Sequence, residues 1–121
     1  MILNATLTQV NQPFDSIAGD VTYPTSGPAL SIRCCLDSPT SAQRWTIDEL
    51  AIDASAMLYV PLTPLQAAAT AAGDSMTDTF LKNAQVLVQL DGETSARTYM
   101  VRRAIPRVGA IPHVECFIKA Q

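Results

Sequence analysis

Three segments of this chain alternate apolar and polar residues with a period of two, and this pattern constrains the fold more than any other feature. Because successive side chains of a β-strand point to opposite faces, each segment should form a strand with one face buried and one face available. These segments cover residues 3–8, 30–37 and 113–119, so we expect a mainly β fold. The side chains predicted to point inward in the two longer segments are Leu30, Ile32, Cys34, Leu36, Val114, Cys116 and Ile118.

A fourth alternating segment, residues 84–90, leads into a predicted hairpin. Asp91-Gly92 follows it, and this is a common turn pair because glycine accepts positive φ. We expect the chain to return as an antiparallel strand over residues 96–103, across a loop of five residues at most. The inward side chains of the first strand would be Ala84, Val86, Val88 and Leu90.

Two short helices are predicted in the middle of the chain. Residues 46–49 have capping-box spacing, and apolar residues recur at helical intervals to residue 54. A strand over residues 56–60 should follow, because Pro61 disfavours helical backbone in the residue before it. The second helix is expected over residues 64–72, with Thr63 as N-cap, Pro64 at the first helical position and Gly73 as its stop.

The whole chain of 121 residues has the length of one domain, residues 1–121. Loops rich in turn residues are expected at 11–15, 23–28, 37–43 and 107–111. Many short strands joined by polar loops predict a small antiparallel β-barrel or sandwich with one or two short inserted helices. The sequence has no apolar run near 18 residues and no signal-like start, so we expect neither a membrane span nor a secretory signal.

The inventory of reactive residues argues against an enzyme. His113 is the only histidine and follows Pro112 at the start of a strand, where a surface role is favoured over general-base catalysis. No glycine-rich phosphate loop is present. The carboxylates at positions 48, 49, 53, 74 and 78 are better explained by capping and solvation than by acid–base chemistry. We expect no catalytic residue, no cofactor and no metal, with an acidic metal site as the remaining alternative.

The three cysteines do not form a disulfide framework. Cys34 and Cys35 are adjacent, and their spacing to Cys116 matches no zinc pattern. We expect reduced, structural thiols and synthesis in the cytoplasm. Trp45, the only tryptophan, is interpreted as a core or interface anchor before the first helix, with ligand stacking as the alternative.

Charge is distributed unevenly along the chain. Residues 1–96 contain three basic and ten acidic residues, a net charge of −7, whereas residues 97–121 contain five basic residues and one acidic residue, a net charge of +4. The sum is the −3 of the whole chain. Three interpretations remain open: solvated arginines, a contact with an acidic surface of a neighbour, or direct nucleic-acid binding. The candidate interface patch consists of Arg97, Arg102, Arg103 and Arg107.

The order of these elements resembles that of the small head-completion proteins of tailed bacteriophages, also called stopper, head-closure or head–tail joining proteins. The resemblance covers Leu30 to Ala120 and includes the stretches "TIDEL", "MLYVP", "GDSM", "VLVQLDGETSARTYMVRR" and "HVECFIKA". It implies a compact β-barrel whose copies form a ring below the portal and adaptor, close the DNA channel and provide the surface on which the tail docks. The tail-completion proteins of the same neck are similar in size and are the nearest alternative.

The resemblance also implies partners and a location. The partners would be other copies of the chain, the portal or adaptor proteins, tail-completion or tail proteins, and packaged DNA nearby in the channel, with no membrane. The protein would be made in the host cytoplasm and end in the neck of the virion. A flexible segment would face the channel, and residues 62–79 and 37–43 are its candidates. The candidate channel-facing residues are Thr63, Gln66, Thr70, Asp74 and Thr77.

Two further functions stay open at this stage. One is a monomeric nucleic-acid or small-ligand binding module on an oligonucleotide-binding-type barrel. The other is an enzyme with a carboxylate-only site, which would need a bound divalent metal. Within the ring hypothesis, the basic end around Arg102 and Arg103 could contact the acidic body of the next copy, because head-to-tail contacts require two complementary surfaces.

Overall fold

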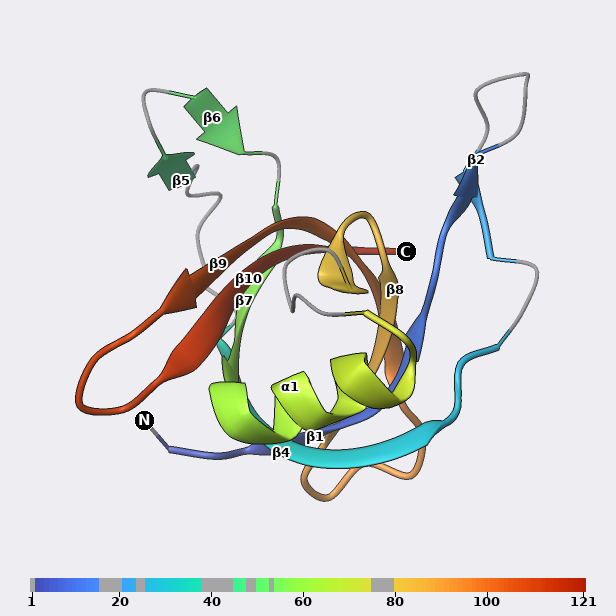
Figure 1. The fold of residues 1–121 in the computed structure, drawn as a ribbon, viewed down its shortest axis with the longest axis horizontal. Helices are drawn as coiled ribbons and strands as arrows, with labels where there is room; N and C mark the ends of the chain where they lie inside the picture. The colour runs from blue at the N-terminus through green and yellow to red at the C-terminus, as the bar shows by residue number, and fades with distance from the viewer. Residues whose placement is uncertain are drawn as a thin grey trace.

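The protein is a closed, six-stranded antiparallel β-barrel, which confirms the mainly β prediction (Figure 1). The computed structural model describes residues 2–15, 21–23, 26–37, 45–47, 50–52, 54–74 and 80–121. Around the barrel the strands follow the order β1-β4-β7-β10-β9-β8, and β8 pairs with β1 to close it. The barrel strands are β1 (Ala5–Asn11), β4 (Ala29–Asp37), β7 (Ala56–Pro61), β8 (Gln85–Leu90), β9 (Arg97–Arg107) and β10 (His113–Ala120).

The alternating segments bury the faces that their sequences predict. In β4 and β10 the expected inward residues pack in one core cluster, except for Leu30, which is only partly buried at its edge. The same holds for β8, where Leu90 is the partly buried member. Apolar side chains from all six strands therefore fill the barrel, and their burial is the main stabilising contribution to this fold.

Two small hairpins lie outside the barrel. One pairs β2 (Phe14–Asp15) with β3 (Val21–Thr22), and the other pairs β5 (Trp45–Ile47) with β6 (Leu50–Ile52). In Figure 1 both project away from the barrel, on different sides of it. The β2–β3 hairpin occupies part of what was predicted as a loop over residues 11–15, and Asn11 belongs to β1.

The helix predicted from residue 46 is wrong, because this segment forms the β5–β6 hairpin. Thr46 pairs with Ala51, and Ile47 pairs with Leu50. A nine-residue stretch is too short to hold a helix without tertiary support, and aromatic and β-branched residues favour the strand. The strand predicted next, residues 56–60, is confirmed as β7.

The second predicted helix is confirmed as α1 (Leu62–Ala71), which crosses the barrel in Figure 1 and packs against β4, β7 and β10. It begins two residues earlier than predicted. Pro61 is its N-cap residue and provides no side-chain hydrogen bond. Pro64 then falls in the first turn, where helix amides have no partner and proline is tolerated. No helix in the described ranges is long and apolar enough to cross a membrane.

The predicted stop of α1 at Gly73 is confirmed by its geometry. Gly73 has φ +88°, and its amide donates to the carbonyl of Thr70 at 3.0 Å. The Asp74 amide donates to the carbonyl of Ala69 at 2.9 Å. This pair of hydrogen bonds is a Schellman motif, which a residue without a Cβ forms most easily.

The β8–β9 hairpin is confirmed, but β9 is longer than expected. It begins at Arg97, after a six-residue connection rather than five, and it continues through Pro106 to Arg107. The loop predicted over 107–111 is therefore residues 108–112. The pairing of β9 with β8 ends at Met100, so the later part of β9 pairs with β10 only. Pro106 is therefore accommodated, because no strand on the β8 side needs a backbone N–H from this residue.

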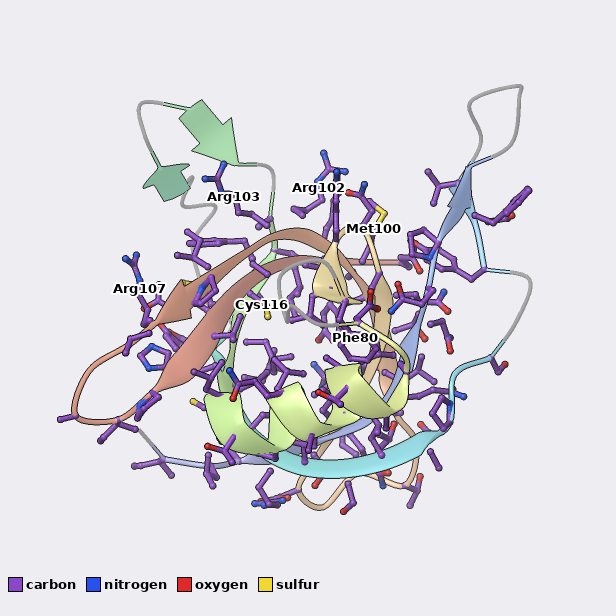
Figure 2. The ribbon with its side chains drawn as sticks, in the orientation of Figure 1. Phe80, Met100, Arg102, Arg103, Arg107 and Cys116 are labelled. Carbon is purple, nitrogen blue, oxygen red and sulfur yellow. The ribbon has the colours of Figure 1, made fainter. Side chains whose placement is uncertain are left out.

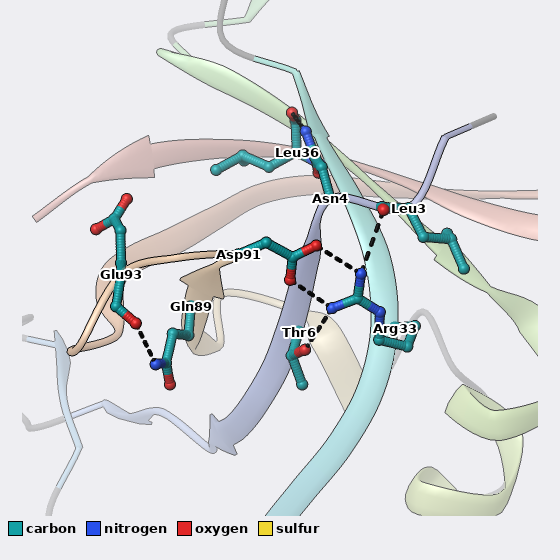
Figure 3. Close-up of polar contacts among 8 residues, drawn as sticks. All are labelled: Leu3, Asn4, Thr6, Arg33, Leu36, Gln89, Asp91 and Glu93. Atoms are coloured by element: carbon teal, nitrogen blue, oxygen red, sulfur yellow. Dashed lines mark hydrogen bonds and ion pairs between the residues drawn. The ribbon is translucent and has the colours of Figure 1, made fainter.

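An ion pair ties the β8–β9 turn to β1 and β4 (Figure 3). The Arg33 guanidinium donates to both carboxylate oxygens of Asp91, at 2.6 and 2.8 Å, and also to the Thr6 hydroxyl and the Leu3 carbonyl. The hydrogen bonding from Arg33 lowers the pKa of the Asp91 carboxyl. The bidentate geometry fixes one end of the barrel where three strands meet.

Candidate functional site

A β-bulge in β9 places two consecutive arginines on the surface. Phe117 of β10 pairs with Arg103, whereas the next residue, Ile118, pairs with Val101, so Arg102 is an extra residue in β9. An extra residue interrupts the alternation of side chains along a strand. Arg102 and Arg103 are consequently both exposed, whereas Val101 is buried, and both point outward from the barrel in Figure 2.

The segment before β8 brings a third cation to this bulge. The Val101 amide donates to the carbonyl of Ala84 at 2.9 Å, and the Ala84 amide donates to the carbonyl of Leu81 at 3.1 Å. Asn83 has φ +54°, and the Tyr23 hydroxyl donates to its carbonyl at 2.8 Å. These contacts hold Lys82 and Asn83 beside the bulge.

Together these residues line a cavity of about 340 Å³ that opens to solvent. We call it the bulge pocket. Of the six described residues that line it, three are cations and none is acidic or aromatic. In the described part of the chain, neither Lys82 nor Arg102 has an ion-pair partner. The pocket is lined by Lys82, Asn83, Val101, Arg102, Arg103 and Ala104.

The other two arginines of the predicted patch lie elsewhere and are paired. Arg97 contacts Glu93 at 2.7 Å, and Arg107 contacts Glu115 at 3.3 Å. Each lies four or five positions from the bulge, about 15 Å along a strand. Arg102 and Arg103 therefore lie next to each other at the bulge, whereas Arg97 and Arg107 each form a separate ion pair at an end of β9.

Three of the five predicted channel-facing residues lie on a helix rather than in a loop. Thr63, Gln66 and Thr70 are exposed positions of α1, whose opposite side buries Leu65 and Ala69 in the core. Residues 62–71 are therefore helical, and the expectation that this segment faces a channel stays a prediction. Asp74 follows the helix stop and is partly buried, and Thr77 lies outside the described residues.

His113 lies at the start of β10, as predicted, and makes local contacts. One ring nitrogen lies 2.9 Å from the Ile111 carbonyl, and the other lies 3.3 Å from a Glu115 carboxylate oxygen. The ring also packs at 5.9 Å against Tyr59. These contacts orient the strand end, and no nucleophile faces the imidazole among them.

The three cysteines are free, with Cys34 and Cys116 buried and Cys35 partly buried. Burial raises the pKa of both the Cys34 and Cys116 thiols to about 12. Thiolates are the reactive form, so the two buried thiols act as small apolar groups of the core. The side chains of Trp45 and of the predicted carboxylates at 48, 49, 53 and 78 lie outside the description.

Lys82 and Asn83 were missed by the sequence analysis, because the sequence contains a signal for the bulge but none for the residues opposite it. Two successive arginines in an alternating strand break its period and indicate a bulge. The residues opposite depend on the observed hairpin register: Gln85 pairs with Met100, so two and three further steps place Asn83 and Lys82 opposite Arg102 and Arg103.

No group of three or more histidine, cysteine or acidic residues that could hold a metal occurs in the described ranges. Comparisons with known proteins add no identification. No protein-family model matches the sequence, and searches of curated proteins and of solved structures found no match. The function must therefore be argued from the barrel, its projecting hairpins and the bulge pocket.

Proposed function

We propose that this protein is a structural component of the neck of a tailed bacteriophage. In this role its copies form a ring below the portal or adaptor, close the DNA channel and provide the surface on which the tail docks. The resemblance in the order of the strands and the second helix supports the proposal, although the first helix of that order is a hairpin here, and a compact β-barrel is the fold that it implies. The other support comes from the surface of the barrel.

A closed barrel limits how copies can associate. Each of its strands pairs with a neighbour on both sides over at least part of its length, so little edge is left at which another copy could extend the sheet. Contacts between copies then fall mainly to side chains, loops and projecting hairpins. The β2–β3 hairpin and the β9–β10 loop both extend from the barrel, on opposite sides of it in Figure 1.

The observation that carries the proposal is that large apolar side chains are exposed on these two projections. Phe14 in β2 is 59% exposed, and Val108 and Ile111 in the β9–β10 loop are 87% and 68% exposed. Exposed apolar groups at defined places favour a protein partner. A ring of identical subunits needs two different surfaces on opposite sides of each subunit, because its contacts are head-to-tail.

The test uses DNA-filled heads that lack tails, from the phage that carries this gene. The purified 13.0 kDa chain is mixed with the heads, and its mass alone is measured by light scattering. Electron micrographs should show added density at the portal vertex, and the heads should retain their DNA. A protein that leaves the vertex bare and the DNA leaking contradicts the proposal.

A matched pair of variants links this result to the apolar loop. Val108→Asp with Ile111→Asp places charge on two exposed side chains, so the fold should persist while ring formation on the heads is lost. Ser95→Asp adds charge to an exposed position of the β8–β9 connection and should leave assembly intact. Equal assembly by both variants would remove the β9–β10 loop from the interface.

A further inference from the structure

We propose that the bulge pocket is an anion site that binds phosphate groups of the backbone of double-stranded DNA. This goes beyond the ring function, because it assigns direct DNA contact to four named residues. It also stands independently of the neck role, since it rests on the pocket alone. The residues that would contact phosphate are Lys82, Asn83, Arg102 and Arg103.

The charge balance of the surface is the first argument. Arg33, Arg97 and Arg107 each have a carboxylate partner within 3.3 Å. Lys82 and Arg102 have none in the described part of the chain, and none of the described residues that line their pocket is acidic. Like charges gathered around one cavity repel each other, and a bound anion relieves that repulsion.

The chemistry of the lining favours phosphate. Arginine offers planar pairs of N–H donors that match phosphate oxygens, and lysine adds a compact positive charge. The Asn83 amide can donate a further hydrogen bond. A volume of about 340 Å³ exceeds the space that one carboxylate fills, and it leaves room for a phosphate with part of its sugar.

The shape of the site favours duplex DNA over a single strand or a free nucleotide. None of the described residues that line the pocket is aromatic, so they offer a base no surface on which to stack. Both arginines are exposed and point outward from the barrel, so a continuous backbone can reach them (Figure 2). Contacts of this kind position DNA without reading its sequence.

The bulge explains why such a site can exist on an acidic protein. In a regular strand Arg102 and Arg103 would point to opposite faces, and one guanidinium would enter the barrel. The extra residue turns both outward, next to Lys82. Bulges often re-aim side chains at functional positions.

Binding of a fluorescent 30-base-pair duplex, followed by anisotropy at several salt concentrations, tests the proposal. The two cations without an ion-pair partner, Lys82 and Arg102, give a log–log salt slope of about −1.8 on phosphates, so affinity should fall about 12-fold between 50 and 200 mM salt. Arg102→Gln should reduce the slope to about −0.9 and the fall to about 3.5-fold. Arg97→Gln removes an arginine paired with Glu93 and should leave the slope unchanged.

The result that overturns the proposal can take three forms. Inorganic phosphate could shift the amide NMR signals of Arg102 while the duplex does not bind, which would make this a free-anion site. Polyglutamate could bind more tightly than DNA, which would assign the pocket to an acidic protein. Equal slopes for Arg102→Gln and Arg97→Gln would place DNA binding elsewhere. None of these results depends on whether the protein binds phage heads.

Discussion

Among the glycines that the structure describes, Gly27 is the one at which an added methyl group meets the closest atoms. It lies just before β4, against the end of β1, and a Cβ added there would stand 2.0 Å from the Val10 carbonyl oxygen and 3.1 Å from its carbon. Both are backbone atoms, so neither can rotate away. Gly27→Ala must therefore move residues 26–28 away from β1.

The size of the effect follows from the hydrogen bonds that this movement breaks. The backbone N–H of Gly27 donates to the side-chain oxygen of Asn11 at 2.8 Å, and the Gly27 carbonyl accepts from the side-chain amide of Gln9 at 2.6 Å. Asn11 is only 7% exposed, so losing its partner costs about 1–3 kcal/mol, and the second bond contributes about 1 kcal/mol. We expect the free energy of unfolding to fall by about 2–4 kcal/mol, out of roughly 5–15 kcal/mol for a domain.

Urea unfolding followed by far-ultraviolet circular dichroism measures this difference. The control is Gly109→Ala, where an added Cβ meets no atom within 4 Å, and its stability should stay within about 0.5 kcal/mol of wild type. Combining Gly27→Ala with Asn11→Ala should cost less than the sum of the two, because they remove the same hydrogen bond. Equal stability of the two glycine variants would refute the close approach of Gly27 to Val10.

Three further outcomes test local features of the fold. Gly73→Ala should destabilise the protein by about 1–2 kcal/mol in urea unfolding, because alanine is strained at positive φ. The control Gly109→Ala should not show this loss. The Arg33 guanidinium lowers the pKa of the Asp91 carboxyl in the folded protein. The stability that this ion pair contributes is therefore present above the unfolded-state pKa of about 3.9, and it is lost as the pH falls through the lower pKa of the folded state. Asp91→Asn should therefore flatten the decline of the melting temperature below about pH 4. Iodoacetamide at pH 8 should label Cys35 alone in the native protein, and a second label by mass spectrometry would contradict the burial of the other two thiols.

The strands could be predicted because their physical signal is local. In β4, Ile32, Cys34 and Leu36 each enter the core because a period of two puts every second side chain on one face. Gly73 was predictable for a similar reason, since its conformation excludes most other residues. Closure of the barrel was not fixed by these patterns. It depends on the pairing of β1 with β8, whose paired residues are more than 70 positions apart in the chain.

The β5–β6 hairpin shows where local patterns fail. Spacing from Thr46 to Glu49 fits a capping box, and the apolar residues that follow fit one turn or two of helix. In such a short window the same residues also fit two three-residue strands. The hairpin projects from the barrel, so a helix in its place would lack packing against the core, and helix propensity alone is a weak guide.

Only the arginines of the bulge pocket could be predicted from the sequence. The residues opposite them depend on the hairpin register, which the length of the connection sets. A five-residue loop pairs Leu90 with Ala96, whereas the observed register pairs Val88 with Arg97. A one-residue error shifts every partner along the strand. The adjacent arginines were therefore visible in the sequence, but the residues opposite them were not.

Ion pairing separates Arg33, Arg97 and Arg107 from Arg102, and this makes the two proposals independent. The apolar ring contact is assigned to Val108 and Ile111 in the β9–β10 loop, and DNA contact is assigned to Arg102 at the bulge. Aspartates at the loop should abolish assembly on heads and leave the salt slope of DNA binding unchanged. Arg102→Gln should do the reverse, because the arginine that ties the loop strand to its neighbour is Arg107, paired with Glu115. If each change impaired both properties, one shared surface would have to replace the two assigned here.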